Sequence, residues 1–237
     1  AHCISQWGYD FRPPYLRIVE IRKEIPDAPL LALTASATPA IQKDIIEKLE
    51  LENPVIIKQS FERPNLSYSA FHVDIAIPKI NSILSSIKGS SIIYCRTRKR
   101  TQEIAKLLQG QGYQASWYHA GLDAETRQQR QQDWKEDRTP IMVCTNAFGM
   151  GIDKPNVRVV IHVGIPDCLE NYYQEAGRAG RDGKKAYAVL LYTSAEMEEL
   201  QKSAEERFPP LTIIKEVYQA IANYLQLPAG SGEGTYF

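Results

Sequence analysis

Two arginines spaced three residues apart are the residues of this chain best suited to phosphate chemistry. Residues 172–183 read YYQEAGRAGRDG, so small residues separate Arg178 from Arg181. A guanidinium donates two N–H groups at once and stabilises the charge that builds up in phosphoryl transfer. The phosphate-cradling sequence G-x-x-x-x-G-K-[ST] does not occur in the chain. The pattern predicts one half of a two-part nucleotide site, and the alternative is a basic turn on a solvated surface.

A second polar segment, residues 145–153 (TNAFGMGID), directly follows an apolar run. Ligands gather at the carboxyl ends of parallel strands. Gly149 and Gly151 allow backbone amides to face a phosphate, and Asp153 can accept hydrogen bonds from ribose hydroxyls. The alternative is a simple turn at the end of a strand.

Residues 94–100 (YCRTRKR) also lead from an apolar run into a predicted helix. Helix N-termini attract phosphate, so Arg96 and Thr97 are candidates for binding a phosphate of a nucleic-acid backbone. For at least two of the three residues 98–100 we favour a solvated basic face. The hydroxyls of residues 34–38 (TASAT) either cap the next helix or relay a change between a nucleotide pocket and a second domain.

Residues 3–13 (CISQWGYDFRP) place aromatic and arginine side chains around a glycine. Aromatic rings and guanidinium planes stack on unpaired bases. A buried aromatic cluster is the usual alternative, but Gly, Asp and Pro favour a loop here, and loops rarely bury so much aromatic area.

Short apolar runs rich in Ile and Val alternate with amphipathic segments, which is typical of parallel strands covered by helices on both faces. The predicted strands are 30–34, 55–58, 91–95, 114–118, 141–145, 157–163 and 186–192. The alternation predicts a doubly wound α/β sheet.

Capping signals predict several helix limits. Thr38 and Pro39 begin a helix that runs to about Leu49, and Asp123 caps another that runs to Trp134. Ile104, Leu107 and Leu108 form the apolar face of a further helix that ends at Gly110. After Ser194 we expect an acidic helix, a break at residues 208–210, and an amphipathic helix to about Tyr224.

Composition places the chain among ordinary globular proteins, with 43% hydrophobic and 24% charged residues. The formal net charge is zero, but residues 55–195 carry 19 Lys and Arg against 13 Asp and Glu. This basic middle hints at a polyanionic partner. Four scattered cysteines without a C-x-x-C pair argue against zinc or a disulfide framework and favour a reducing, cytoplasmic location. No apolar run approaches membrane-spanning length.

Together the motifs resemble those of RecQ-type DNA helicases of superfamily 2. Residues 1–13 resemble the end of a DEAH box and the aromatic-rich loop that follows it, and residues 34–38 resemble motif III. Residues 94–100, 145–153 and 174–181 resemble motifs IV, V and VI. The aromatic loop directly after Ala-His separates RecQ from DEAD-box RNA helicases.

The resemblance implies a RecA-like fold of two lobes, of which this chain holds part. Residues 1–53 are expected to be the end of lobe 1, 54–71 a linker, 72–194 a complete lobe 2, and 195–237 a helical extension. The DEAH carboxylates and the P-loop are expected upstream, so we expect no ATPase activity from the chain alone. Exposed strand edges of residues 1–53 favour disorder, swapping or self-association.

The resemblance also implies roles for individual residues. It assigns Arg181, Arg178 and Gln174 to catalysis, with Arg181 as the arginine finger, and Asp153, Gly151 and Gly149 to ATP binding. It assigns His2, Ser36 and Thr38 to coupling between the sites. It assigns to DNA binding Trp7, Phe11, Arg12, Arg96, Thr97, Thr145 and Asn146.

The implied activity is ATP- and Mg²⁺-dependent 3′→5′ unwinding of DNA in recombination and repair. The implied partners are single-stranded or junction DNA and the remainder of lobe 1, with no membrane and a nucleoid-associated location if the source is bacterial. Many RecQ proteins continue into a four-cysteine zinc module, but no cysteine follows Cys168. Zinc is therefore not expected in this chain. The alternatives are a binding lobe without chemistry and an RNA-remodelling relative.

Overall fold

A computed structural model describes residues 1, 4, 17–34, 37–149, 152–207 and 209–225. Its strands are β1 (Leu66–His72), β2 (Ser90–Cys95), β3 (Ala115–Tyr118), β4 (Ile141–Cys144), β5 (Val157–Val163) and β6 (Ala186–Tyr192). Its helices are α2 (Ile18–Glu24), α3 (Pro39–Lys48), α4 (Ala76–Ser86), α5 (Arg98–Gly110), α6 (Ala124–Lys135), α7 (Leu169–Ala176), α8 (Ser194–Arg207) and α9 (Leu211–Tyr224).

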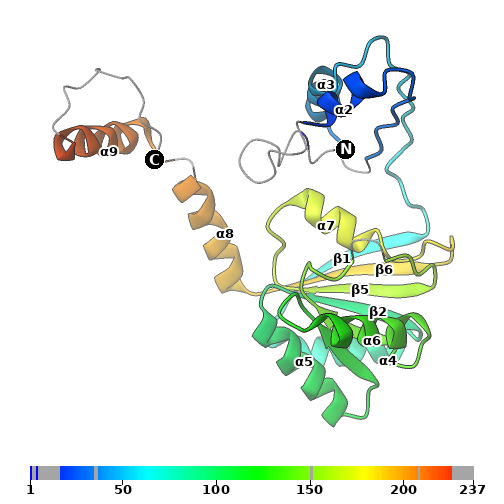
Figure 1. Cartoon of the computed structure of the whole chain (residues 1–237). Helices are drawn as coiled ribbons and strands as arrows, with labels where there is room; N and C mark the ends of the chain where they lie inside the picture. The colour runs from blue at the N-terminus through cyan, green and yellow to red at the C-terminus, as the bar shows by residue number, and fades with distance from the viewer. Residues whose placement is uncertain (2–3, 5–16, 35–36, 150–151, 208, 226–237) are drawn as a thin grey trace.

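The six strands form one parallel sheet in the order β1-β6-β5-β2-β4-β3. The sheet confirms the predicted α/β class. Every residue of β2 and β4 is buried, which explains why both read as continuous apolar runs. The chain enters the sheet from the α2–α3 part, and α8 leads away from the end of β6 toward α9 (Figure 1).

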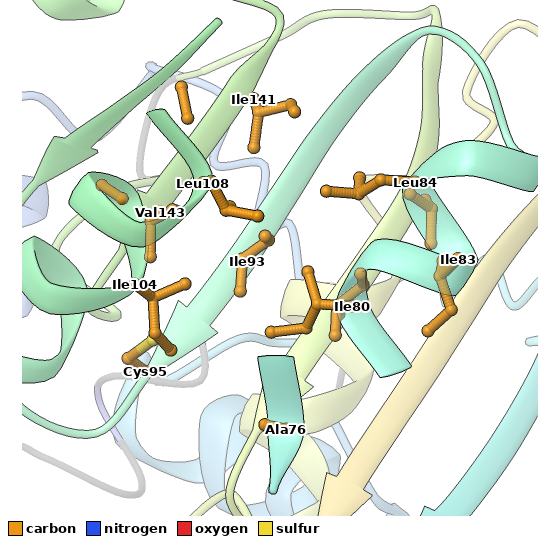
Figure 2. Packing of buried hydrophobic residues seen from close by; sticks show 14 of the residues in the cluster. Ala76, Ile80, Ile83, Leu84, Ile93, Cys95, Ile104, Leu108, Ile141 and Val143 are labelled. Carbon is orange, nitrogen blue, oxygen red and sulfur yellow. The ribbon is translucent and has the colours of Figure 1, made fainter. Parts of the chain in front are cut away.

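Helices cover both faces of the sheet. On one face, α4 and α5 pack on the strands through residues such as Ile80, Ile104 and Leu108 (Figure 2). On the other face, Trp134 of α6 and Ala176 of α7 pack against the opposite sides of the same strands. Thr38 and Asp123 cap α3 and α6 as predicted, accepting hydrogen bonds from the amides three residues ahead. None of the described helices is long and apolar enough to cross a membrane.

The structure corrects some of the expected elements. Residues 30–34 and 55–58 are not strands where the structure describes them, and Leu31 and Val55 are exposed. Leu107 is also exposed, so the buried face of α5 is formed by its neighbours instead. Strand β1 begins at Leu66, inside the segment assigned to the linker. Its side chains are mostly exposed because it lies at the sheet edge, which removes the apolar signal.

Lys154 secures the connection between α6 and β5. Its Nζ donates to the carbonyls of Trp134 at 2.8 Å and Lys135 at 2.9 Å, and to Asp137 Oδ1 at 2.8 Å. The Lys154 residue is buried, so its ammonium group joins α6 to the chain that leads into β5 away from water. The Trp134 carbonyl also accepts from the Asp137 amide at 3.2 Å, and Asp137 Oδ1 also accepts from the Ser90 hydroxyl.

We predict that Lys154→Met lowers the free energy of unfolding by about 1–3 kcal/mol, because the substitution removes three hydrogen bonds made by one buried ammonium group. The measurement is urea unfolding followed by far-UV circular dichroism. Lys99→Met is the matched control, since the Lys99 ammonium is exposed, and its effect should stay within about 0.5 kcal/mol. Equal midpoints for both variants would contradict the capping role of Lys154.

Candidate nucleotide and nucleic-acid sites

A cleft of about 710 Å³ opens at the carboxyl ends of strands β2, β4 and β5. The parallel register brings these ends to one edge of the sheet, pairing Tyr94 with both Cys144 and His162. Segments far apart in the sequence therefore line one cavity, among them Arg96, Thr97 and Asn146. The edge is where parallel α/β sheets bind ligands.

One wall of the cleft is cationic. Arg96 and Arg100 line it, and Thr97 between them caps α5 by accepting a hydrogen bond from the Arg100 amide at 3.2 Å. The free amides at the start of α5 and its dipole add to the positive potential of the guanidinium groups. This wall can bind an anion such as a backbone phosphate.

The facing wall is acidic and comes from helix α8. Glu196 and Glu199 both line the cleft, and Glu199 Oε2 lies 3.2 Å from Arg96 Nη1. Both partners of this pair are about half exposed, so water screens their attraction and the pair is worth no more than about 1 kcal/mol. An incoming phosphate can therefore replace Glu199 as the partner of Arg96.

Two residues that line the cleft, His162 and Glu175, form a hydrogen-bonded pair that the sequence did not reveal. His162 Nε2 of β5 is 2.8 Å from Glu175 Oε2 of α7. The His162 ring stacks on Tyr94, with centroids 5.2 Å apart, and meets Tyr172 edge-on at 4.8 Å. Burial raises the pKa of the Tyr94 hydroxyl well above its usual value, so it stays protonated and donates to the Phe148 carbonyl at 3.0 Å. This group fixes α7 to the sheet.

Arg178 lies close to this group. Its Nη1 donates to the Gly149 carbonyl at 2.6 Å. A Cβ at position 149 would come within 2.4 Å of the Arg178 Cζ, and Gly149 has a φ of 143°, so only glycine fits there. Among the described residues, the buried Arg178 Nε has no hydrogen-bond partner. Motif V and motif VI thus meet through direct contact of one guanidinium with one backbone carbonyl.

Arg181 makes a different contact. Its Nη1 donates to Asp153 Oδ1 at 2.7 Å and to the Ile152 carbonyl at 3.3 Å. The Asp153 side chain is 82% exposed, so the ion pair lies at the surface and contributes little to stability. The two residues expected to contact ATP from opposite motifs therefore lie side by side and remain accessible.

Comparison with known proteins agrees with this geometry. Residues 75–183 match the family model described as helicase conserved C-terminal domain. The chain is 45% identical over 208 residues to the ATP-dependent DNA helicase RecQ of Haemophilus influenzae, covering 87% of the chain and 34% of that protein. It is 41% identical over 204 residues to the ATP-dependent helicase SGS1 of Saccharomyces cerevisiae, covering 85% of the chain and 14% of that protein.

These matches support a RecQ-type fragment of a superfamily 2 helicase. It spans about a third of the length of the bacterial relatives it matches.

Solved structures give the same fold. Saccharomyces cerevisiae Dbp5 bound to RNA and ADP BeF3 matches with a TM-score of 0.66 at 20% identity, covering 87% of this chain and 55% of that one. A DEAD box protein from Methanococcus jannaschii matches with a TM-score of 0.55 at 24% identity, covering 71% of this chain and 46% of that one. The RecA-like architecture expected for a RecQ-type chain is confirmed.

In this RecQ-type chain the predicted site residues fall into two groups. Arg96, Thr97 and Asn146 line the cleft. Thr145 directly precedes Asn146 and is buried, and its amide is bonded to the Tyr118 carbonyl at 3.1 Å. The contacts of Arg178 and Arg181 with residues of motif V make up the second group.

Other predicted residues lie elsewhere. Gln174 lies on α7 next to Glu175, the hydrogen-bond partner of His162. Thr38 Oγ1 accepts a hydrogen bond from the Ile41 amide at 3.4 Å, so its hydroxyl caps a helix, as one of the two interpretations held. The remaining predicted residues lie outside the described ranges: His2, Trp7, Phe11, Arg12, Ser36 and Gly151.

Sequence reasoning missed His162 and Glu175. His162 lies inside an apolar run, where a histidine is usually a satisfied core residue, and Glu175 lies between residues already assigned to motif VI. The available signal was a titratable residue on a strand expected to be buried on both faces. Such a residue needs a partner, and helix α7 supplies it.

Proposed function

We propose that the chain is the part of an ATP-dependent DNA helicase that supplies the arginines of the ATP site and part of the nucleic-acid track. The observation that carries this proposal is the 45% identity to a RecQ helicase over 208 residues, a stretch that includes both groups of site residues. The relatives' names give ATP as the energy source and DNA as the substrate. Recombination, repair and 3′→5′ polarity are proposed on the same family relation.

Arg181 is proposed as the finger on the γ-phosphate of ATP. Its ion pair with Asp153 is exposed and weak, so the guanidinium can leave the carboxylate for a more highly charged triphosphate. Asp153 is then free to accept hydrogen bonds from the ribose. Arg178, held at the Gly149 carbonyl, adds positive charge beside it. ATP supplies the energy of hydrolysis, and these side chains bind and orient its phosphates.

Mg²⁺ is proposed as the ion that accompanies ATP. The described residues contain no group of three or more His, Cys, Asp or Glu side chains that could hold a metal. We therefore assign Mg²⁺ no ligands among the described residues.

The cleft is proposed as the track for a DNA strand. Arg96, Thr97 and Asn146 line its cationic side, and the start of α5 adds free amide groups. These are contacts to phosphate and sugar, which position a strand without reading its sequence. The acidic wall from α8 competes with the strand for Arg96.

The two groups of residues are proposed to act between two lobes. Residues 1–53 are assigned to the end of lobe 1, residues 72–194 to lobe 2 and residues 195–237 to a helical extension. The linker of residues 54–71 contributes its last part, from Leu66, to the sheet as β1. Lobes that close on ATP and open after hydrolysis then move along the strand.

The test of this proposal is unwinding by the full-length gene product. Fluorescent duplexes of DNA and of RNA with identical sequences and 3′ tails are compared with and without ATP. We expect ATP-dependent separation of the DNA duplex and little separation of the RNA duplex. Equal activity on RNA would favour an RNA-remodelling enzyme, and no ATP-dependent activity on either duplex would favour a binding lobe.

We predict that Arg181→Ala in the full-length protein lowers the rate of ATP hydrolysis by about 10³–10⁵-fold, because an arginine finger contributes that much to phosphoryl transfer. DNA affinity should stay nearly unchanged, since Arg181 is not among the cleft residues. Arg138→Ala is the control, because Arg138 pairs with acidic residues at the surface near the end of α6. Turnover by Arg181→Ala at the parent rate would exclude the finger role.

We predict that Arg96→Ala weakens binding of single-stranded DNA and makes its salt dependence shallower. Each phosphate contact contributes about 0.7 to the slope of log affinity against log salt concentration for single strands. Fluorescence anisotropy over a series of salt concentrations measures both quantities. Lys99→Ala is the control, since Lys99 lies on the exposed face of the same helix and does not line the cleft. An unchanged slope in Arg96→Ala would remove Arg96 from the track.

A further inference from the structure

The linker segment 61–65 packs against the loop that carries both motif VI arginines. The loop follows α7 and spans residues 177–183, whereas the segment lies directly before strand β1, more than 100 positions earlier in the sequence. The chain passes from the α2–α3 part to the sheet through this segment (Figure 1). Any displacement of the linker therefore acts directly on the loop.

Arg63 makes the central contacts. Its guanidinium donates to the carbonyls of Gly177 at 3.3 Å, Ala179 at 3.0 Å and Gly180 at 3.0 Å. Carbonyls at the end of a helix lack N–H donors within the helix, and the loop that follows has no ladder of its own. One charged group satisfies three of them through charge-assisted hydrogen bonds. The backbone on both sides of Arg178 is thereby held to the linker.

Asn65 fixes the far end of the same loop. Its Nδ2 donates to the Gly180 carbonyl at 2.7 Å and the Lys184 carbonyl at 2.9 Å. Gly180 has a φ of 63°, and a Cβ there would lie 2.6 Å from Asn65 Nδ2. Position 180 therefore requires glycine both for its backbone conformation and for the close approach of Asn65.

Phe61 holds the end of the helix that precedes the loop. Its carbonyl accepts a hydrogen bond from the Tyr173 hydroxyl at 2.9 Å, and the two rings meet edge-on with centroids 5.8 Å apart. Three residues of one short segment thus bind α7, the loop and the start of β6. These contacts join residues more than 100 positions apart in the sequence, so the position of the loop depends on the linker.

We propose that Arg63 is a positioning residue for Arg178 and Arg181. Arg63 contacts neither phosphate-binding guanidinium. It holds the backbone carbonyls on either side of Arg178, up to the residue directly before Arg181, and so sets where both side chains start. The linker that bears Arg63 joins the α2–α3 part to the sheet. A displacement of the α2–α3 part therefore changes the positions of Arg178 and Arg181. This inference rests on the proposed function, in which these arginines act on ATP.

The test uses Arg63→Ala and Arg63→Lys in the full-length protein. We expect Arg63→Ala to lower kcat for DNA-stimulated ATP hydrolysis at least tenfold, with KM for ATP and DNA affinity within about twofold of the parent. Arg63→Lys should recover only part of kcat, because an ammonium cannot reproduce the planar fork that reaches three carbonyls. Arg22→Ala is the matched control, since Arg22 also donates to two carbonyls, Leu49 and Glu50, but far from the loop. Its kcat should equal that of the parent.

Amide hydrogen exchange separates this inference from the proposed function. Without any nucleotide, the peptide covering residues 177–184 should exchange faster in Arg63→Ala than in the parent, and peptides of α4 and α5 should not. A parent protein that lacks ATP turnover would overturn the proposed function and leave this exchange result to decide whether Arg63 holds the loop. Parent-like kcat and parent-like exchange in Arg63→Ala would overturn the positioning role. A loss of kcat with an equal loss of DNA affinity and a lower Tm would reduce Arg63 to a general structural residue.

Discussion

Backbone carbonyls at the end of helix α7 must find hydrogen-bond donors, and the loop with both arginines has its shape because Arg63 and Asn65 supply them. Without such donors, this loop of small residues would be held mainly through its own amides, among them those of Gly180 and Asp182, which bond to the carbonyls of Val157 and Pro155. Glycine at position 180 gives the close approach, and the linker restores the order that glycine removes. Gly180 in the loop thus leaves room for a phosphate, and the linker gives the loop a defined position.

The parallel sheet joins this loop to the cleft. Strands β2, β4 and β5 end at one edge, and α7 is fixed there by the hydrogen bond between His162 and Glu175. Tyr94, stacked on His162, lines the cleft and donates to the Phe148 carbonyl one residue before Gly149. The cleft and the loop with both arginines are therefore connected through Tyr94, His162 and Glu175 and through a few residues of motif V. A shift of α7 would change both the cleft and the loop with both arginines.

The elements that could be predicted from the sequence are those with a buried apolar pattern or a local capping signal. Strands β2 and β4 were recognised because they are buried on both faces, and the caps Thr38 and Asp123 because capping is local chemistry. Strand β1 was missed since an edge strand with exposed side chains lacks an apolar pattern. The contacts of Arg63 could not be inferred either, because a hydrogen bond across more than 100 residues follows from the topology of the sheet and leaves no local signal.

The two motif VI arginines differ in environment, and this difference separates the roles that we propose for them. Arg178 is fixed at the Gly149 carbonyl, where a partly buried guanidinium contributes positive charge from a constant position. Arg181 rests on an exposed carboxylate, a contact worth no more than about 1 kcal/mol. A side chain that has to reach a phosphate only when the lobes close needs a weak resting partner of this kind. A strong buried pair would oppose that movement, so the surface position of Asp153 is consistent with a finger that engages and withdraws in each cycle.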